Sequence, residues 1–225
     1  MSEFIAFGNF TLDDVVTAEG LVKRNQLGGN GVYSAAGMRL WGVDVSIISV
    51  VGDDFPVSYL DMLTECGIDI SSVAVVSQRH QLRSRAFYFS DGSRTDVIDE
   101  AKEIITKEIA QELDLVSEYP SMGSKLHRTV WPVFTPDTSQ VPKSLGQVRG
   151  AHLAPGNLDN NRQLALIMKQ MSDQKIVISY DWPWWDWDCE GQDDANLLGH
   201  IDYLMPSIEE ANIYSEPLDR NAPDA

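Results

Sequence analysis

The amino-acid sequence predicts an α/β fold in which a mainly parallel sheet is covered by helices on both faces. Short apolar or β-branched runs at residues 4–7 and 45–51 each end in glycine followed by Asn or Asp, as expected of buried strands. Helical segments at 31–40 and 57–66 follow them, and strand-like and helical segments alternate again after residue 149. Such alternation is typical of a parallel sheet built from strand–helix–strand units.

The first four elements are predicted in the order strand, helix, strand, helix. Asp54 is predicted to cap the helix at 57–66, with Pro56 in its first turn and Gly67 at its end. Further along, strands are expected at 149–153, 175–180 and 201–205, and helices at 158–171 and 194–199.

Two regions depart from this alternation. Residues 73–77 and 84–90 have the composition of short strands, and Asp91-Gly92 is a hairpin signal, so a small antiparallel lid is predicted within about residues 73–98. Residues from about 117 to 147 contain four prolines and little periodicity. We expect a long irregular connection there.

Composition restricts the class of ligand. The 225 residues carry a formal net charge of −17, which disfavours nonspecific binding to nucleic acid or anionic lipid. No run approaches the roughly 20 apolar residues that span a bilayer. Cys66 and Cys189 form no disulfide framework, and the four histidines lack the spacing of metal ligands. A cytoplasmic protein that binds a small molecule, without a metal site, is expected.

The stretch LGGNGVYSAAGMRLWG at 27–42 is the first candidate binding element. Gly28 and Gly29 allow close backbone approach to a ligand, and the helix that follows offers unpaired N–H groups to a hydroxyl or an anion. A tight turn without a ligand explains the same residues, and Asp13 beside Asp14 could equally be a solvated turn residue. Neither G-x-G-x-x-G nor G-x-x-x-x-G-K-[ST] fits the chain, which disfavours dinucleotide-binding and P-loop folds.

The spacing of several motifs, taken together, resembles the N-terminal part of the ribokinase-like, or PfkB, carbohydrate kinase family. These motifs are G-N-x-x-x-D at 8–13, G-G-N at 28–30, W-G at 41–42, G-D-D at 52–54 and L-x-x-x-G-I-D at 63–69. The resemblance extends over residues 4–98 and returns more weakly from 149 to 214. It implies a ribokinase-like three-layer sandwich with a small β lid, forming one domain over residues 1–225 that is incomplete at its C-terminal end.

The resemblance also assigns roles to residues. It places Asp13, Gly28, Gly29 and Asn30 at the hydroxyls of a sugar or nucleoside substrate, and it implies ATP and Mg²⁺ as cofactors. Glu210 matches the glutamate that helps to organise the magnesium and phosphate environment, although Ser207 replaces the asparagine of that motif. Ser207 to Glu210 is also an S-x-x-E capping box, so a structural role and a cofactor role both stay open.

The family's G-A-G-D motif, whose aspartate is the general base, does not occur in the 225 residues, so the catalytic residue is unknown. The expected function is ATP-dependent phosphoryl transfer to a hydroxyl of a sugar or related polyol, with the catalytic C-terminal segment missing from this chain. The alternative is an inactive sugar- or nucleoside-binding pseudokinase; an oxidoreductase is more remote.

Two further features stay open. The Trp-rich stretch at 181–190 is either a second carbohydrate subsite or a loop packed over the sheet. The resemblance also suggests a homodimer formed through the lid.

Overall fold

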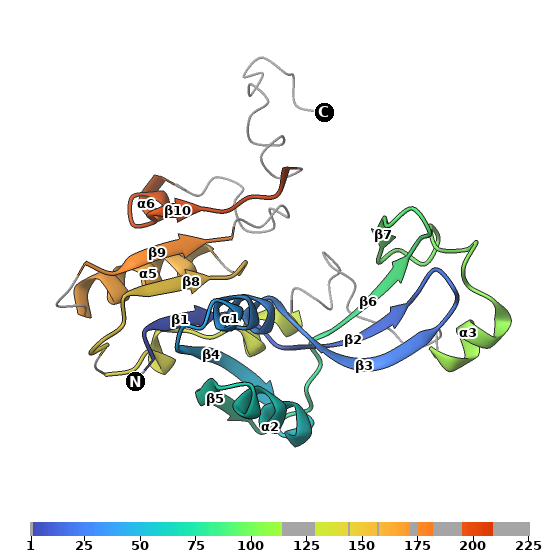
Figure 1. Cartoon of the computed structure of the whole chain (residues 1–225), viewed down its shortest axis with the longest axis horizontal. Helices are drawn as coiled ribbons and strands as arrows, with labels where there is room; N and C mark the ends of the chain where they lie inside the picture. Colours follow the sequence, from blue (N-terminus) through green and yellow to red (C-terminus); the bar gives the residue numbers. More distant parts are fainter. Residues whose placement is uncertain are drawn as a thin grey trace, which may run out of the picture.

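The structure is a computed structural model, and it describes residues 2–113, 129–143, 145–156, 158–171, 175–181 and 195–208 (Figure 1). Glu210 and residues 182–190 therefore lie outside the described residues, as does most of the first half of the expected irregular connection.

The main sheet has six parallel strands in the order β10-β9-β8-β1-β4-β5. Every residue of β4 is buried, as expected of a central strand covered on both faces. This sheet confirms the predicted α/β class. Its strands are β1 (Phe4–Phe7), β4 (Val45–Gly52), β5 (Ile68–Val76), β8 (Gly150–Leu153), β9 (Val177–Tyr180) and β10 (Tyr203–Leu204).

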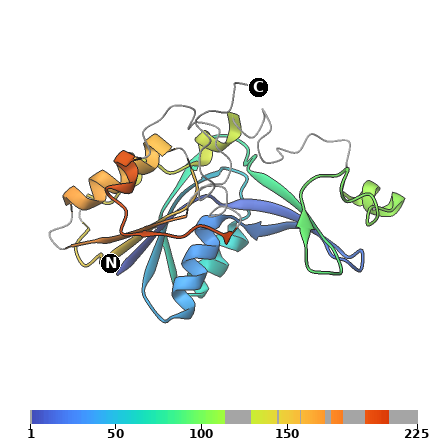
Figure 2. The same cartoon turned by 90° about the horizontal axis from the view of Figure 1, so that it is seen from above.

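Helices cover both faces of the main sheet and complete the three layers (Figure 2). On one face lie α1 (Asn30–Leu40) and α2 (Val57–Glu65), which pack on a core that includes Phe10, Ile47 and Leu63. On the other face lie α5 (Leu158–Met171) and α6 (Ala195–Leu198), which pack on a core centred on Phe7 and Tyr180. Two short 3-10 helices, η1 (Trp131–Phe134) and η2 (Thr138–Gln140), occupy part of the expected irregular connection.

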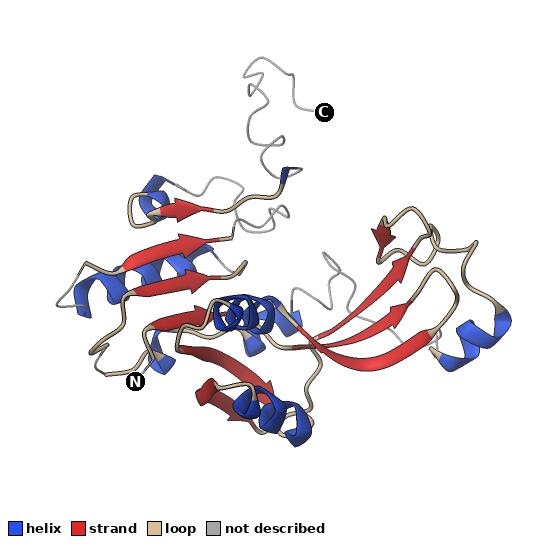
Figure 3. Ribbon diagram, in the orientation of Figure 1, coloured by secondary structure: helices blue, strands red, loops and turns tan. Residues whose placement is uncertain are grey.

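A second, smaller sheet projects from the edge of the main one (Figure 3). Its strand order is β3-β2-β6-β7, with β2 and β6 parallel and the two outer pairs antiparallel. One face is covered by α3 (Lys107–Glu112), through a cluster that contains Val16, Phe87, Ile109 and Leu113. The strands are β2 (Thr11–Val16), β3 (Val22–Gly28), β6 (Arg83–Tyr88) and β7 (Arg94–Thr95).

The small sheet differs from the expected lid in which segments build it. Residues 73–76 of the predicted 73–77 strand form the end of β5 and belong to the main sheet, whereas β6 and β7 do lie in the small sheet. Its other two strands come from residues 11–28, which the sequence analysis did not assign to strands. Their polar composition conceals them, because β3 exposes four consecutive polar side chains and β2 buries Asp14.

None of the helices that the structure describes is both long enough and apolar enough to cross a lipid bilayer.

His80 joins the two sheets, since it lies in the segment that leads from β5 to β6 and is only 1% exposed. Its Nδ1 accepts a hydrogen bond from the Gly52 N–H, and its Nε2 donates to the Phe10 carbonyl, each at 3.2 Å. Its ring packs edge-on against Phe55 and Phe134, with ring centroids 4.8 Å and 4.7 Å away. This arrangement requires a neutral imidazole, because one ring nitrogen accepts and the other donates.

The predicted capping role of Asp54 is wrong. The helix begins at Val57 with Pro56 as its N-cap, and no side chain caps it. The Asp54 carboxylate instead accepts a hydrogen bond from the backbone N–H of His80 at 2.6 Å. A contact between residues far apart in the sequence thus takes the carboxylate away from the helix end.

We expect His80 to make the free energy of unfolding depend on pH. Burial lowers the His80 pKa to about 4, from 6.5 in the unfolded chain. Below pH 6.5 the imidazole is therefore protonated in the unfolded state but not in the folded state. As the pH decreases from 6.5 to the folded pKa, the free energy of unfolding decreases. The His80 contribution should cost about 2 kcal/mol between pH 7.5 and pH 5.0.

Urea unfolding of wild type and His80→Gln at both pH values measures this contribution as the difference in their pH dependence. His152→Gln is a parallel case within the main sheet, because burial also lowers the His152 pKa to about 4 and the same reasoning predicts a reduced pH dependence there. An NMR titration of the His80 ring in the wild type provides an independent readout. Equal pH dependence in wild type and His80→Gln, or a His80 ring that titrates near pH 6.5, would contradict the assignment.

Candidate functional site

The candidate site lies where the two sheets meet, and two glycine-containing segments touch there. Gly8 follows β1, and Gly31 lies in the first turn of α1. A Cβ on Gly8 would lie 2.6 Å from the Gly31 nitrogen, and a Cβ on Gly31 would lie 2.8 Å from the Gly8 carbonyl carbon. The end of β1 and the start of α1 are therefore in backbone contact that only glycine permits.

Gly29 and Asn30 fix the entry into α1. Gly29 has a φ of 104°, and a Cβ there would overlap with the Asn9 carbonyl oxygen. The Asn30 side-chain Oδ1 accepts hydrogen bonds from the backbone N–H groups of Asn9 and Gly31, both at 2.9 Å. Its Nδ2 lies 3.5 Å from the Pro155 carbonyl, beyond the end of β8. Asn30 thus ties three chain segments together at this point.

Asp13 projects from the middle of β2 above Gly28. Its Oδ1 accepts a hydrogen bond from the Ser84 hydroxyl at 2.7 Å. A Cβ on Gly28 would overlap with Asp13 Oδ2, so glycine at position 28 leaves the space that the carboxylate occupies. The structure therefore brings Asp13, Gly28, Gly29 and Asn30, the four residues predicted to bind substrate, into one neighbourhood.

Asp14 has a different environment although it is the next residue. It is fully buried, and its carboxylate pairs with Arg24 at 3.3 Å and accepts from the Asn25 N–H at 2.8 Å. Because side chains alternate along a strand, Asp14 faces α3 while Asp13 faces the opposite side. Of these two carboxylates, Asp13 is the one available to a ligand at the junction.

Tyr33, on the first full turn of α1, lies within electrostatic range of Asp13. The pKa of its phenol is raised, first by partial burial and then by the negative charge of Asp13 and by Tyr88, while the positive charge of Arg94 acts to lower it. Ser84, Tyr88 and Arg94 were not identified from the sequence. The signal that could have found them is strand alternation, since Ser84 and Tyr88 are an even number of residues apart on β6.

Comparison with known proteins finds similar structures but no similar sequences. No family model matches the sequence, and no curated protein matches it. The fold is similar to Giardia lamblia ribokinase, with a TM-score of 0.61 at 17% identity over 97% of this chain and 62% of that one. It is similar to Burkholderia thailandensis nucleoside kinase in complex with inosine, with a TM-score of 0.60 at 15% identity over 93% of this chain and 62% of that one.

A third similar structure is the Cryptococcus neoformans var. grubii ribokinase in complex with ADP, with a TM-score of 0.57 at 14% identity over 91% of this chain and 58% of that one. The chain has the ribokinase-like fold. It spans about 60% of the length of these structures, with 62%, 62% and 58% of each covered. At identities of 14% to 17% the likeness shows the fold, and the ligands named are those of the other proteins.

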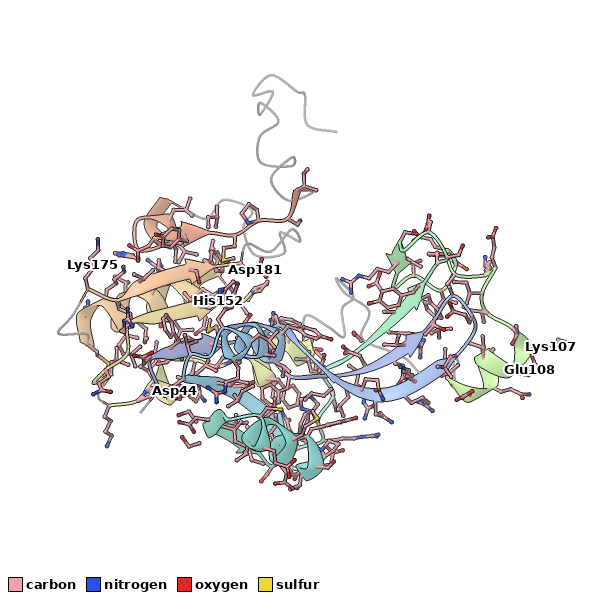
Figure 4. All side chains as sticks on the ribbon, in the orientation of Figure 1. Asp44, Lys107, Glu108, His152, Lys175 and Asp181 are labelled. Carbon is pink, nitrogen blue, oxygen red and sulfur yellow. The ribbon has the colours of Figure 1, made fainter. Side chains whose placement is uncertain are left out.

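Figure 4 labels His152, which lies in β8, and Asp181, which directly follows β9. His152 Nδ1 lies 3.0 Å from the Ser179 hydroxyl, and the Asp181 N–H donates to the Leu153 carbonyl. Within the described part of the chain, no group of three or more His, Cys, Asp or Glu side chains is placed to hold a metal ion.

We expect Gly29 to tolerate no side chain. Gly29→Ala combines a left-handed backbone with overlap at Asn9, and it should lower the free energy of unfolding by at least about 2 kcal/mol. Gly37→Ala in the same helix is the control, because a Cβ there meets no atom within 4 Å and should stabilise the helix by about 0.5–1 kcal/mol.

Urea unfolding of both variants tests this pair, and loss of folded protein in Gly29→Ala counts as the expected result. A Gly29→Ala variant within about 0.5 kcal/mol of the wild type would show that the junction does not need glycine there.

Proposed function

We propose that this chain binds a sugar, a nucleoside or a related polyol at the junction of its two sheets, as the substrate-binding part of a PfkB-type kinase. The observation that carries the proposal is the Asp13 carboxylate, which lies beside the start of α1 and over Gly28. A carboxylate accepts hydrogen bonds only, so it selects ligands that present hydroxyl groups.

The reaction we propose is transfer of the γ-phosphoryl group of ATP to a hydroxyl of that ligand. In-line transfer depends mainly on positioning and on stabilisation of charge, and this chain's residues would supply the positioning. Asp13 would hold and orient hydroxyls, while Gly28 and Gly29 let the backbone of the β3–α1 connection approach the ligand closely. The ADP and inosine complexes of the two similar structures support a nucleotide and a polyhydroxylated ligand in this fold.

The described residues do not by themselves provide the ATP and magnesium half of such a site. They contain no group of metal-ligating side chains, and Glu210, predicted to organise the cofactors, lies outside them. The proposal for this chain therefore rests on the substrate half. Homodimerisation through the small sheet and a cytoplasmic location stay predictions.

A binding function without phosphoryl transfer is the second candidate. The 225 residues supply the predicted substrate-binding side chains, and no general base is assigned among them. A coupled assay for ADP release with ATP, Mg²⁺ and a panel of sugars and nucleosides separates the two candidates, because both predict binding and only the first predicts turnover.

We expect Asp13→Asn to weaken ligand binding. Replacing the carboxylate by an amide should cost about 1–3 kcal/mol of binding free energy, the scale of a lost charged hydrogen bond. Asp61→Asn is the matched control, because Asp61 is an exposed carboxylate on α2 and belongs neither to the small sheet nor to the contact between β1 and α1. Calorimetry with D-ribose, D-fructose, adenosine and inosine, and with D-ribose 5-phosphate, D-fructose 6-phosphate and D-gluconate, measures the effect.

Binding that Asp13→Asn and Asp61→Asn leave equally unchanged would remove Asp13 from the site. No binding of any of these compounds to the wild type would contradict the proposed function itself.

A further inference from the structure

The small sheet has one covered face and one face that points away from α3. Val16 and Phe87 pack under α3, so the residues that alternate with them on β2 and β6 lie on the opposite side. We call this side the open face, and it includes Asp13, Ser84, Tyr88, Arg94 and Lys23. Lys23 belongs to it because its neighbour Val22 packs against the α3 cluster.

Asp13 and Arg94 lie at two ends of the open face. Asp13 is paired with Ser84 across β2 and β6, close to the main sheet. Arg94 is paired with Tyr88 across β6 and β7. Ser84 and Tyr88 are four residues apart, which corresponds to about 13 Å along a strand. Figure 1 shows β6 running away from the main sheet towards β7.

Tyr33, on α1, lies within electrostatic range of both ends. Its side chain is 64% exposed, and its phenol interacts electrostatically with Asp13, Tyr88 and Arg94. Tyr88 is also partly exposed, at 37%. Two exposed phenol groups, those of Tyr33 and Tyr88, therefore lie near the Asp13 carboxylate and the Arg94 guanidinium.

The Arg94 guanidinium has no ion-pair partner in the described part of the chain. A guanidinium presents its donors as a planar fork that matches carboxylate and phosphate oxygens, and phenol hydroxyls add further donors. The chemistry at this end of the face suits an anion, whereas the chemistry at Asp13 suits hydroxyls.

We propose that the ligand is a polyol with one anionic group, a phosphate or a carboxylate, which Arg94, Tyr33 and Tyr88 bind while Asp13 holds hydroxyls at the other end. This inference rests on the proposed function, because it names the substrate class of the same site. It favours sugar phosphates and sugar acids over neutral sugars and nucleosides.

Calorimetry on matched ligands tests the inference with the 225-residue chain. The neutral and anionic pairs are D-ribose and D-ribose 5-phosphate, D-fructose and D-fructose 6-phosphate, and D-glucitol and D-gluconate. The first two pairs report on phosphate and the third on carboxylate, so the arms distinguish the two anions. Adenosine and inosine represent uncharged nucleosides.

Arg94→Gln is the test variant, and Lys23→Gln is its control. Both remove one positive charge from the open face, but Lys23 lies on β3 and Arg94 on β7, three strand spacings apart. At about 4.8 Å per spacing the two backbones are about 14 Å apart. Lys23→Gln therefore measures the effect of losing one positive charge from the protein's overall electrostatic field, without loss of a contact at Arg94.

The inference predicts that at least one anionic ligand binds the wild type about tenfold or more tightly than its neutral counterpart, the scale of one charge-assisted contact. Arg94→Gln should abolish most of this preference and leave neutral ligands within about twofold, whereas Lys23→Gln should preserve the preference. Rising salt should weaken binding of the anion most.

Neutral sugars or nucleosides that bind as tightly as the anionic ligands would overturn the inference and leave the proposed function standing. A preference that survives in Arg94→Gln would overturn it as well. Absence of binding by every compound would instead contradict the proposed function, and the inference would fall with it.

Discussion

Backbone contact between the end of β1 and the start of α1 is the constraint on which the rest of this structure depends. The Gly8 and Gly31 backbones meet without side chains between them, and Gly29 brings the chain against the Asn9 carbonyl. The Asn9 side chain is 1% exposed and donates to the Phe134 carbonyl at 2.7 Å, so the same point also holds the segment that carries η1. A Cβ at these glycines would force the segments apart.

This contact places the small sheet as well as the helix. β3 ends at Gly28 and α1 begins at Asn30, so the direction of β3 is set by the way the chain enters α1. His80 provides the second connection, from β5 into β6, through hydrogen bonds to Gly52 and Phe10. Two buried connections on different segments hold the small sheet at the edge of the main one, where strand alternation directs Asp13 to one side and Asp14 to the other. The candidate site is a consequence of that geometry.

Much of the main sheet could be predicted from local sequence, because its elements carry strong local signals. The residues of β4 are β-branched or small and all buried, and α5 occurs at the predicted residues, Leu158–Met171. The small sheet could not be predicted in the same way. The sequence of β2, TLDDVV, contains two acids, and the burial of Asp14 makes sense only once Arg24 and the Asn25 N–H are in place. Its four strands also come from two separated parts of the chain, residues 11–28 and 83–95, so no local window contains the sheet.

In the candidate site, too, some residues could be predicted from the sequence and others could not. Glycine spacing pointed to Gly28, Gly29 and Asn30, and the structure gives each a physical reason, whether space for a carboxylate, a left-handed backbone or a bridge between segments. Arg94 and Tyr88 belong to no recognisable sequence motif. Their proximity could be identified only from the pairing of β6 with β7 in the structure. Asp54 is a case in which a sound local rule failed, because a tertiary hydrogen bond to His80 outweighed helix capping.

Hydrogen–deuterium exchange with and without a saturating concentration of the tightest-binding sugar or nucleoside tests the central claim most directly, since it locates the ligand on the chain. The account predicts slower exchange in three segments, Thr11–Val16, residues 28–33 and residues 84–94, with α5 (Leu158–Met171) unchanged. Protection confined to β8, β9 and β10, with none at residues 11–16 or 28–33, would contradict it and would place the ligand away from the junction of the two sheets.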